Sequence, residues 1–413
     1  MKLRTSDGIT ITIEQQPFAK GGEGTVHKIV APASHLNFCA KLYLPKVINA
    51  EKQQKIEYMV TNPPPEKVTE NQIICWPQAV LFGEEKFVGF IMPLAFDDSI
   101  LLYELCRPKL NRKHHQRWHK FNRNTKQGFE ARLKLCTNLA IAIHRIHSLQ
   151  NYVLVDFKPQ NALVTNDGKI SMLDCDSVQI SKENKVIFPA LVATPEYVPP
   201  ESERLNPSKD KIHPSWDRFA MAIVFYEIMF GLHPFAATFG GEFIDINTLP
   251  GRIRVGLFAH GKHKKHLISL PPPHTTFNHI PHNLKALFWD AFDDDDIRPS
   301  AEKWGQGIFK ELAAGIKLPL PKVVPTKALV KSTKPEVKLV KKQPTGVQPQ
   351  KSQINLKKNQ PRGIQLLQTQ TGSAFMASAA FTFVGALAFG MEGAIAGLFG
   401  MVLVVLTSGL KNL

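Results

Sequence analysis

Four polar side chains in two short segments have the types and the spacing that phosphoryl transfer requires. In VDFKPQNALV, Asp156 is followed two residues later by Lys158 and five residues later by Asn161, and Asp174 of LDCD follows Asp156 by 18 residues. A carboxylate can accept the proton of an attacking hydroxyl, and a lysine can neutralise the γ-phosphate. Amide and carboxylate oxygens can hold Mg²⁺. The pattern predicts a reaction catalysed by positioning and charge neutralisation.

Apolar residues flank both segments, which argues against a chance group of surface polar residues. Leu163 and Val164 end the first segment, and Met172 and Leu173 precede Asp174. We expect these residues to lie in short buried strands, with the polar side chains at the strand ends and facing a cleft.

The segment AKGGEGTV at 19–26 places Gly21, Gly22 and Gly24 between two strand-like stretches. Glycine allows backbone N–H groups to approach phosphate oxygens closely, because no Cβ intervenes. The segment is not a P-loop, since no GK[ST] follows and no helix begins there. We therefore predict a glycine-rich hairpin against nucleotide phosphates.

Lys41 ends an apolar, strand-like stretch, CAK, about 15 residues after Val26. A buried lysine needs a carboxylate partner. Glu57, on the helix expected next, is the natural partner, and Glu51 is its competitor. Such a pair would orient Lys41 toward the α- and β-phosphates, whereas an edge lysine in water is the alternative.

Secondary-structure patterns divide the first 316 residues into a sheet-rich and a helix-rich part. Strand-like stretches occur at 9–15, 26–30, 38–44 and 79–95. Helical patterns occur at 49–60, 129–149 and 217–231. We predict an α+β fold with two lobes, at 8–95 and 96–316, and a cleft between them.

In this order the motifs resemble those of eukaryotic-type Ser/Thr protein kinases, and the resemblance extends from residue 8 to about residue 312. AKGGEGTV resembles the family's G-x-G-x-x-G-x-V, with Ala19 in place of the first glycine. Lys41 matches the phosphate-orienting lysine, and Glu57 its glutamate partner. Met92 lies where the family has its gatekeeper, and the following Pro-Leu-Ala would be the hinge that binds adenine. The resemblance implies that ATP is bound by Ala19, Gly21, Gly22, Gly24, Val26, Lys41, Glu57, Met92 and Leu94.

The resemblance also implies roles for the later motifs. Asp156, Lys158 and Lys41 would be catalytic, and Asn161 and Asp174 would hold Mg²⁺. The resemblance further implies that Thr194 of ATPEYVPPE contacts Asp156 and Lys158 and that Glu201 pairs with Arg298. Asp217 matches the aspartate that opens the family's long central helix.

Two departures from the family pattern bear on regulation. Leu154-Val155 replaces the family's His-Arg, so a phosphorylated activation loop would find no arginine. Asp174-Cys175-Asp176 replaces the family's Asp-Phe-Gly. We expect a constitutively poised kinase that is insensitive to phosphatase; a nucleotide-binding pseudokinase is the alternative. The sequence looks most similar to divergent bacterial members of the family.

The overall composition favours acidic partners. The formal net charge is +16. The five cysteines form no CxxC motif, which fits a reducing cytosol better than a disulfide framework. The first residues lack an apolar stretch, so we expect no signal peptide. The stretch 107–126 is basic with interleaved Trp118 and Phe121, which leaves a nucleic-acid binder as a further alternative, although we do not expect nucleic acid as a partner.

The last hundred residues have a different composition. Residues 317–362 contain twelve lysines and arginines against one glutamate, which predicts a disordered basic linker over 317–372. Residues 374–409 are almost entirely apolar; one helix would extend ~54 Å against a hydrocarbon core of ~30 Å. We therefore predict a two-span hairpin at 373–410 with a break at Met391-Glu392.

Charged residues outside this hairpin predict its orientation. Lys357, Lys358 and Arg362 precede the first span and Lys411 follows the second, so both ends should be cytoplasmic. Together these predictions describe a multi-pass membrane protein whose cytoplasmic kinase domain transfers phosphate from ATP, with Mg²⁺, to hydroxyls of a protein substrate.

Overall fold

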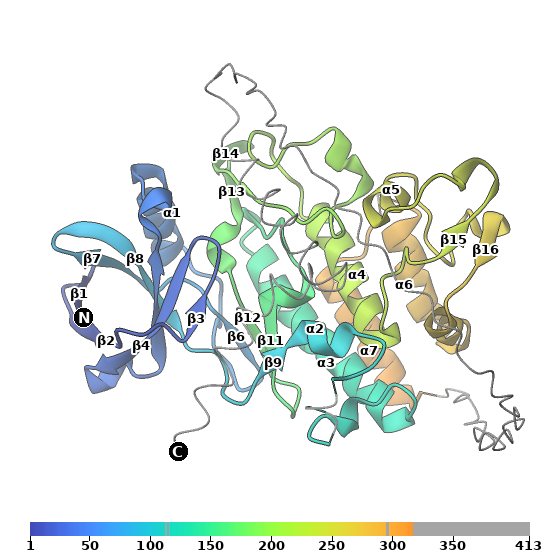
Figure 1. The fold of residues 1–413 in the computed structure, drawn as a ribbon, viewed down its shortest axis with the longest axis horizontal. Coiled ribbons are helices and arrows are strands. Elements are labelled where there is room, and N and C mark those ends of the chain that lie inside the picture. The colour runs from blue at the N-terminus through green and yellow to red at the C-terminus, as the bar shows by residue number, and fades with distance from the viewer. Residues whose placement is uncertain (112–113, 115, 295–296, 317–413) are drawn as a thin grey trace, which may run out of the picture. The chain divides into compact units, whose positions relative to one another are not determined.

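The computed structural model describes residues 1–111, 114, 116–294 and 297–316, and these residues belong to one compact unit (Figure 1). Its first part is an antiparallel sheet in the order β2-β1-β7-β8-β5-β4-β3, and β2 also pairs with β4. The strands are β1 (Lys2–Thr5), β2 (Thr10–Ile13), β3 (Ala19–Lys20), β4 (Gly24–Ala31), β5 (Phe38–Tyr43), β7 (Ala79–Gly83) and β8 (Lys86–Pro93). The additional pairing makes the sheet curl on itself around an apolar interior.

Alternation of side chains explains this sheet. In β2, Ile11 and Ile13 are buried while Thr10 is exposed, as expected for a strand with one face in the core. The same interior cluster includes Leu3 of β1. Strand β1 was not predicted from the sequence, so the lobe begins near residue 2 instead of residue 8.

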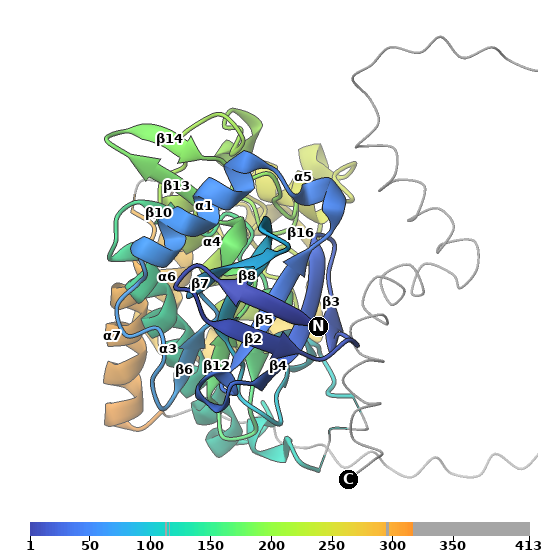
Figure 2. The same cartoon turned by 90° about the vertical axis from the view of Figure 1, so that its left-hand side faces the viewer.

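Helix α1 (Ala50–Thr61) packs against β7 and β8. Asn49 caps its first turn by accepting a hydrogen bond from the backbone of Lys52 at 2.7 Å. The helix ends just before the run of prolines, as predicted. In Figure 2 it runs above the sheet and beside the hairpin of β13 (Gln179–Lys182) and β14 (Lys185–Phe188).

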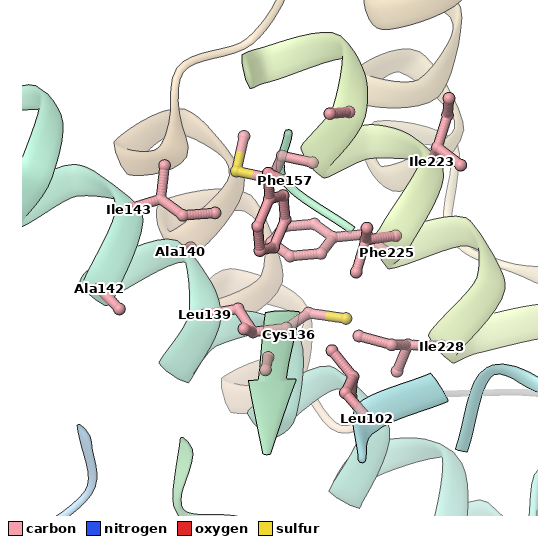
Figure 3. Packing of buried hydrophobic residues seen from close by; sticks show 14 of the residues in the cluster. Leu102, Cys136, Leu139, Ala140, Ala142, Ile143, Phe157, Ile223, Phe225 and Ile228 are labelled. Carbon is pink, nitrogen blue, oxygen red and sulfur yellow. The ribbon is translucent and has the colours of Figure 1, made fainter. Parts of the chain in front are cut away.

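The second part is helical and is built around α4 (Ser215–Phe230), which is buried on nearly all sides. A helix that is apolar all round must be covered by other elements. The helices of this part are α2 (Leu102–Cys106), α3 (Lys126–His147), α4, α5 (Leu249–Arg254), α6 (His282–Phe292) and α7 (Ala301–Ala314). Figure 3 shows Cys136 and Leu139 of α3 facing Phe225 and Ile228 of α4, with Phe157 between them.

A four-stranded sheet positions the predicted site residues. Its order is β6-β12-β11-β9, formed by β6 (Gln72–Ile74), β12 (Ile170–Met172), β11 (Ala162–Val164) and β9 (Ile100–Leu101). β6 runs parallel to β12, and the backbone N–H of Cys75 donates to the Met172 carbonyl at 2.9 Å. The chain just after α1 is therefore hydrogen-bonded to the strand that leads to Asp174.

Three strands of two or three residues complete the described structure. β10 (Tyr152–Val153) pairs with β13, and β15 (Thr238–Phe239) pairs with β16 (Leu267–Ser269). The sheet-rich and helix-rich halves confirm the predicted α+β architecture. The predicted linker at 317–372 and hairpin at 373–410 lie outside the described residues. Within the part that the structure describes, none of the helices combines the length and apolar character needed to cross a bilayer.

Candidate active site

Asp156, Lys158 and Thr194 form a closed triangle of hydrogen bonds. The Lys158 ammonium donates to Asp156 Oδ2 at 2.7 Å and to Thr194 Oγ1 at 2.7 Å. The Thr194 hydroxyl donates to Asp156 Oδ1 at 2.5 Å. Asp156 is 6% exposed, so both of its oxygens are held in fixed directions by neighbouring donors. The contact predicted for Thr194 is therefore present.

Asp217, in the first turn of α4, holds the chain just before Asp156. Its carboxylate accepts hydrogen bonds from the backbone N–H of Leu154 at 2.7 Å and of Val155 at 2.9 Å. It also bonds Nε2 of His147 at 2.8 Å. Val155 has a φ of 65°, a left-handed conformation that is strained for a β-branched residue. These hydrogen bonds stabilise the strained turn that presents Asp156.

Val155 occupies the position where the family motif has an arginine, and its side chain packs in an apolar cluster. Its buried neighbours in that cluster include Ala190, Ile212 and Trp216. Ala190 belongs to the segment between Asp176 and Thr194, which corresponds to the activation segment. Apolar packing, with the β13–β14 hairpin, thus holds this segment without a charged residue at position 155.

The two predicted metal ligands lie at adjacent strand ends. Asn161 precedes β11 and Asp174 follows β12, and the Leu173 N–H donates to the Asn161 carbonyl at 2.8 Å. Asn161 Nδ2 donates to the carbonyl of Asp156 at 2.9 Å, which turns the amide oxygen away from that carbonyl. The Asp174 side chain is 46% exposed. Two hard oxygen donors, one of them accessible, fit Mg²⁺.

Lys41 is oriented by aspartates, and its expected pairing with Glu57 was wrong. Lys41 Nζ lies 2.5 Å from Asp176 Oδ1 and 2.9 Å from Asp174 Oδ1. Glu57 is exposed, and its carboxylate accepts a hydrogen bond from Gln53 at 2.8 Å. The competitor Glu51 is exposed too.

Helical phase explains this correction. The side chains of α1 that face inward are Lys52, Lys55, Ile56 and Met59, at helical spacing. At 100° per residue, Glu57 falls about 150° from the centre of that face. Helix α1 therefore offers lysines to the interior, and the carboxylate that Lys41 needs comes from elsewhere.

Asp176 supplies that carboxylate, in the position where the family motif has glycine. It is 2% exposed, and its Oδ2 accepts a hydrogen bond from the Tyr43 hydroxyl at 2.6 Å. Burial opposes its ionisation, but attraction to Lys41 and Lys52 outweighs burial and holds the pKa of Asp176 below its usual range. Burial likewise opposes the charge on Lys41, yet the two aspartates raise the pKa of Lys41 above its ordinary value.

The glycine-rich segment forms the predicted hairpin. Its two strands pair Ala19 with Val26, and Val26 in turn lies opposite Lys41 on β5. Glycine is required at Gly24, because a Cβ there would lie 2.2 Å from the Leu42 carbonyl oxygen. A Cβ at Gly22 would meet no atom within 4 Å, so the tip of the hairpin borders open space.

The predicted adenine-binding residues lie at the end of β8. Met92 is opposite Cys39 on β5, two residues from Lys41, and is half-buried. Leu94 is also half-buried, and its N–H donates to the Asn37 carbonyl at 2.9 Å. The structure thus brings the residues predicted to bind the nucleotide together around β5, apart from Glu57.

The last predicted contact is a buried ion pair. Two nitrogens of Arg298 contact the two carboxylate oxygens of Glu201 at 2.5 and 2.8 Å. The Arg298 side chain is 2% exposed. This bidentate pair fixes the segment after Thr194 against the helical part.

Comparison with known proteins agrees with this geometry. Residues 16–266 match the family model described as protein kinase domain. The chain belongs to the protein kinase family. Its resemblance to eukaryotic-type kinases is therefore confirmed.

Individual relatives of this chain are also named as kinases. Protein kinase YegI of Escherichia coli K12 is 26% identical over 320 residues, which cover 74% of this chain and 45% of YegI. Serine/threonine-protein kinase MRCK gamma of Mus musculus is 33% identical over 101 residues, 24% of this chain and 6% of that protein. Citron Rho-interacting kinase of Homo sapiens is likewise 33% identical over 101 residues, covering 24% and 5%. The kinase described here thus spans less than half the length of these relatives.

Proposed function

We propose that this kinase transfers the γ-phosphoryl group of ATP to serine and threonine hydroxyls of proteins, with Mg²⁺ as cofactor. The observation that carries the proposal is the triangle of Asp156, Lys158 and Thr194 beside the oxygens of Asn161 and Asp174. The name of the MRCK gamma relative supports the choice of serine and threonine.

Each side chain has a defined part in this proposed reaction. Bound ATP supplies the phosphoryl group, and Mg²⁺ reduces the repulsion among its oxygens. Asp156 accepts the proton of the acceptor hydroxyl as the new O–P bond forms and the bond to the β-phosphate breaks. Lys158 stabilises the negative charge on the transferred group, and Lys41 holds the phosphates that remain on ADP. Asn161 and Asp174 hold the metal.

Thr194 is a positioning residue in this scheme. Its hydroxyl binds both Asp156 and Lys158, so it fixes the direction of the carboxylate before an acceptor arrives. A fixed base avoids the entropic cost of orientation during the reaction.

The test is transfer of radiolabel from γ-labelled ATP by the full chain, purified in a mild detergent, to itself and to casein. Phosphoamino-acid analysis identifies the acceptor. We expect labelled serine or threonine, and none with Asp156→Asn. ATP binding without transfer by the unmodified chain would favour the pseudokinase alternative, which rests on the replaced His-Arg and Phe-Gly positions.

One observation weighs against a nucleic-acid binder. Trp118 and Phe121, the aromatic residues of the basic stretch, are 1% and 2% exposed and stack on each other with ring centroids 5.9 Å apart. Buried rings cannot stack on bases.

We also propose that residues 373–410 anchor the kinase in a membrane as a two-span hairpin, with the kinase domain cytoplasmic. The apolar composition of this segment and the lysines and arginines outside it support the proposal.

A further inference from the structure

The tip of the glycine-rich hairpin carries a carboxylate that is tied to α1. Glu23 lies between Gly22 and Gly24, and its Oε2 is 2.8 Å from Lys52 Nζ. The Glu23 side chain is 36% exposed and that of Lys52 is 13% exposed. An ion pair with one partner so shielded is stronger than a fully exposed pair.

Lys52 belongs to the same charge cluster as Lys41. Its ammonium is 3.9 Å from Asp176 Oδ2, the carboxylate that also binds Lys41, and 4.8 Å from the centre of the Tyr43 ring. It reaches this place because position 52 lies on the inward face of α1. Two ammonium groups thus flank one buried carboxylate.

The positive and negative charges of this cluster are equal in number only while Glu23 belongs to it. Its lysines are Lys41, Lys52 and Lys55, and its carboxylates are Glu23, Asp174 and Asp176. Burial, and to a smaller extent the charge of Lys52, lowers the pKa of Lys55 to about 8. The two aspartates are bound to Lys41. Glu23 alone among the three carboxylates lies on a hairpin tip that borders open space.

The phosphates of a bound nucleotide and the Glu23 carboxylate would compete for the Lys52 ammonium. The hairpin is the element expected to cover the phosphates, so the Glu23 carboxylate would face their negative charge at close range. The low-cost response is for Glu23 to turn toward solvent. The Lys52 ammonium then faces the site without the Glu23 carboxylate, which lies 2.8 Å away in this structure. A negatively charged phosphate oxygen can take the place of that carboxylate.

We propose that Lys52 is a second phosphate-binding amine of the nucleotide site, and that Glu23 occupies it until a nucleoside triphosphate displaces Glu23. The inference rests on the proposed function and deepens it. It assigns phosphate binding to α1, the helix that was expected to supply only a carboxylate. It also makes α1 and the glycine-rich hairpin respond together to nucleotide.

Equilibrium binding of ATP and of adenosine to the full chain, measured by isothermal titration calorimetry, tests this proposal. Lys52→Met should weaken ATP binding about tenfold, the loss expected for one charge-assisted contact, and should leave adenosine binding unchanged. Glu23→Gln should tighten ATP binding severalfold, because the competing charge is gone. The Glu23→Gln gain should vanish in the Lys52→Met background.

Controls keep the outcomes distinct. Glu51→Gln removes an exposed carboxylate from the same helix and should change neither affinity. Lys52→Arg keeps the charge and should retain ATP binding, which guards against a fold defect in Lys52→Met. An unchanged ATP affinity in Lys52→Met, or an undiminished Glu23→Gln gain in the double variant, would overturn the inference while leaving the proposed function intact. Absence of ATP binding by the unmodified chain would overturn both.

Discussion

The substitution Asp176→Asn tests whether Asp176, instead of a glutamate on α1, orients Lys41. Asparagine keeps the size of the side chain and removes its charge, so the packing around this 2%-exposed residue should change little. Removing one partner of a buried ion pair costs about 3–5 kcal/mol, because the other charge remains buried. Asp174 still contacts Lys41 at 2.9 Å, so we expect the lower end, about 3 kcal/mol. At roughly 2 °C per kcal/mol for a large domain, Tm should fall by about 6 °C.

The same substitution should impair catalysis. Without Asp176, Lys41 has only Asp174 as a partner and shifts toward that metal ligand. A displacement of about 1 Å in a positioned group can cost on the order of a hundredfold in rate. The measurements are thermal unfolding followed by circular dichroism and kcat/KM for radiolabel transfer, on the full chain.

Glu57→Gln is the matched control, since it removes a carboxylate from the position that the family pattern favours. Glu57 is exposed and bonded to Gln53, so its Tm and kcat/KM should stay close to those of the unmodified chain. The reasoning is refuted if Glu57→Gln is the more damaging of the two, or if Asp176→Asn leaves both quantities unchanged.

Four further predictions follow from other residues. Asp174→Ala should abolish Mg²⁺-dependent transfer, since it removes a metal ligand; near-normal turnover would show that the metal site is misassigned. Phosphatase pretreatment should leave the transfer rate unchanged, because Val155 packs the activation segment without an arginine; a large loss would contradict this. Burial raises the pKa of Glu227 to about 8, so the folded protein favours the protonated carboxyl, and stability is lost as the pH rises from about 4.5 to 8. Glu227→Gln should therefore raise Tm at pH 8.5 but not at pH 4. An equal change of Tm at both pH values would refute this prediction. Deleting residues 370–413 should release the kinase from membranes, as assayed by flotation with vesicles, and a deletion variant that still floats in high salt would exclude the hairpin as anchor.

The catalytic segment could be predicted because its information is local. Asp156, Lys158 and Asn161 lie within six positions of one another, and their spacing alone restricts how they can be arranged. The strands around Lys41 were likewise predictable from apolar alternation. Short elements were not, because β1 and the β13–β14 hairpin have four residues a strand, too few for a periodic signal.

Side-chain direction was the harder part of the prediction. The match of Glu57 to the family pattern depended on order along the chain, whereas its real direction depends on a phase of 100° per residue. The inward spacing of Lys52, Lys55, Ile56 and Met59 was the signal that could have revealed this. Asp176 could have been found from its place two residues after Asp174. The bond between His147 and Asp217 joins residues 70 positions apart, and nothing local predicts it.

The parallel pairing of β6 with β12 limits how far α1 can travel. The indole N–H of Trp76 donates to the Met59 carbonyl near the end of α1 at 2.8 Å, and Cys75 beside it is hydrogen-bonded to Met172. An outward movement of α1 would therefore break either the hydrogen bond between Cys75 and Met172, two residues before Asp174, or the one between the buried Trp76 indole and Met59. A kinase restrained in this way has a stiff link between α1 and Asp174, the proposed metal ligand, so inactivation by a large rotation of this helix is costly for this chain.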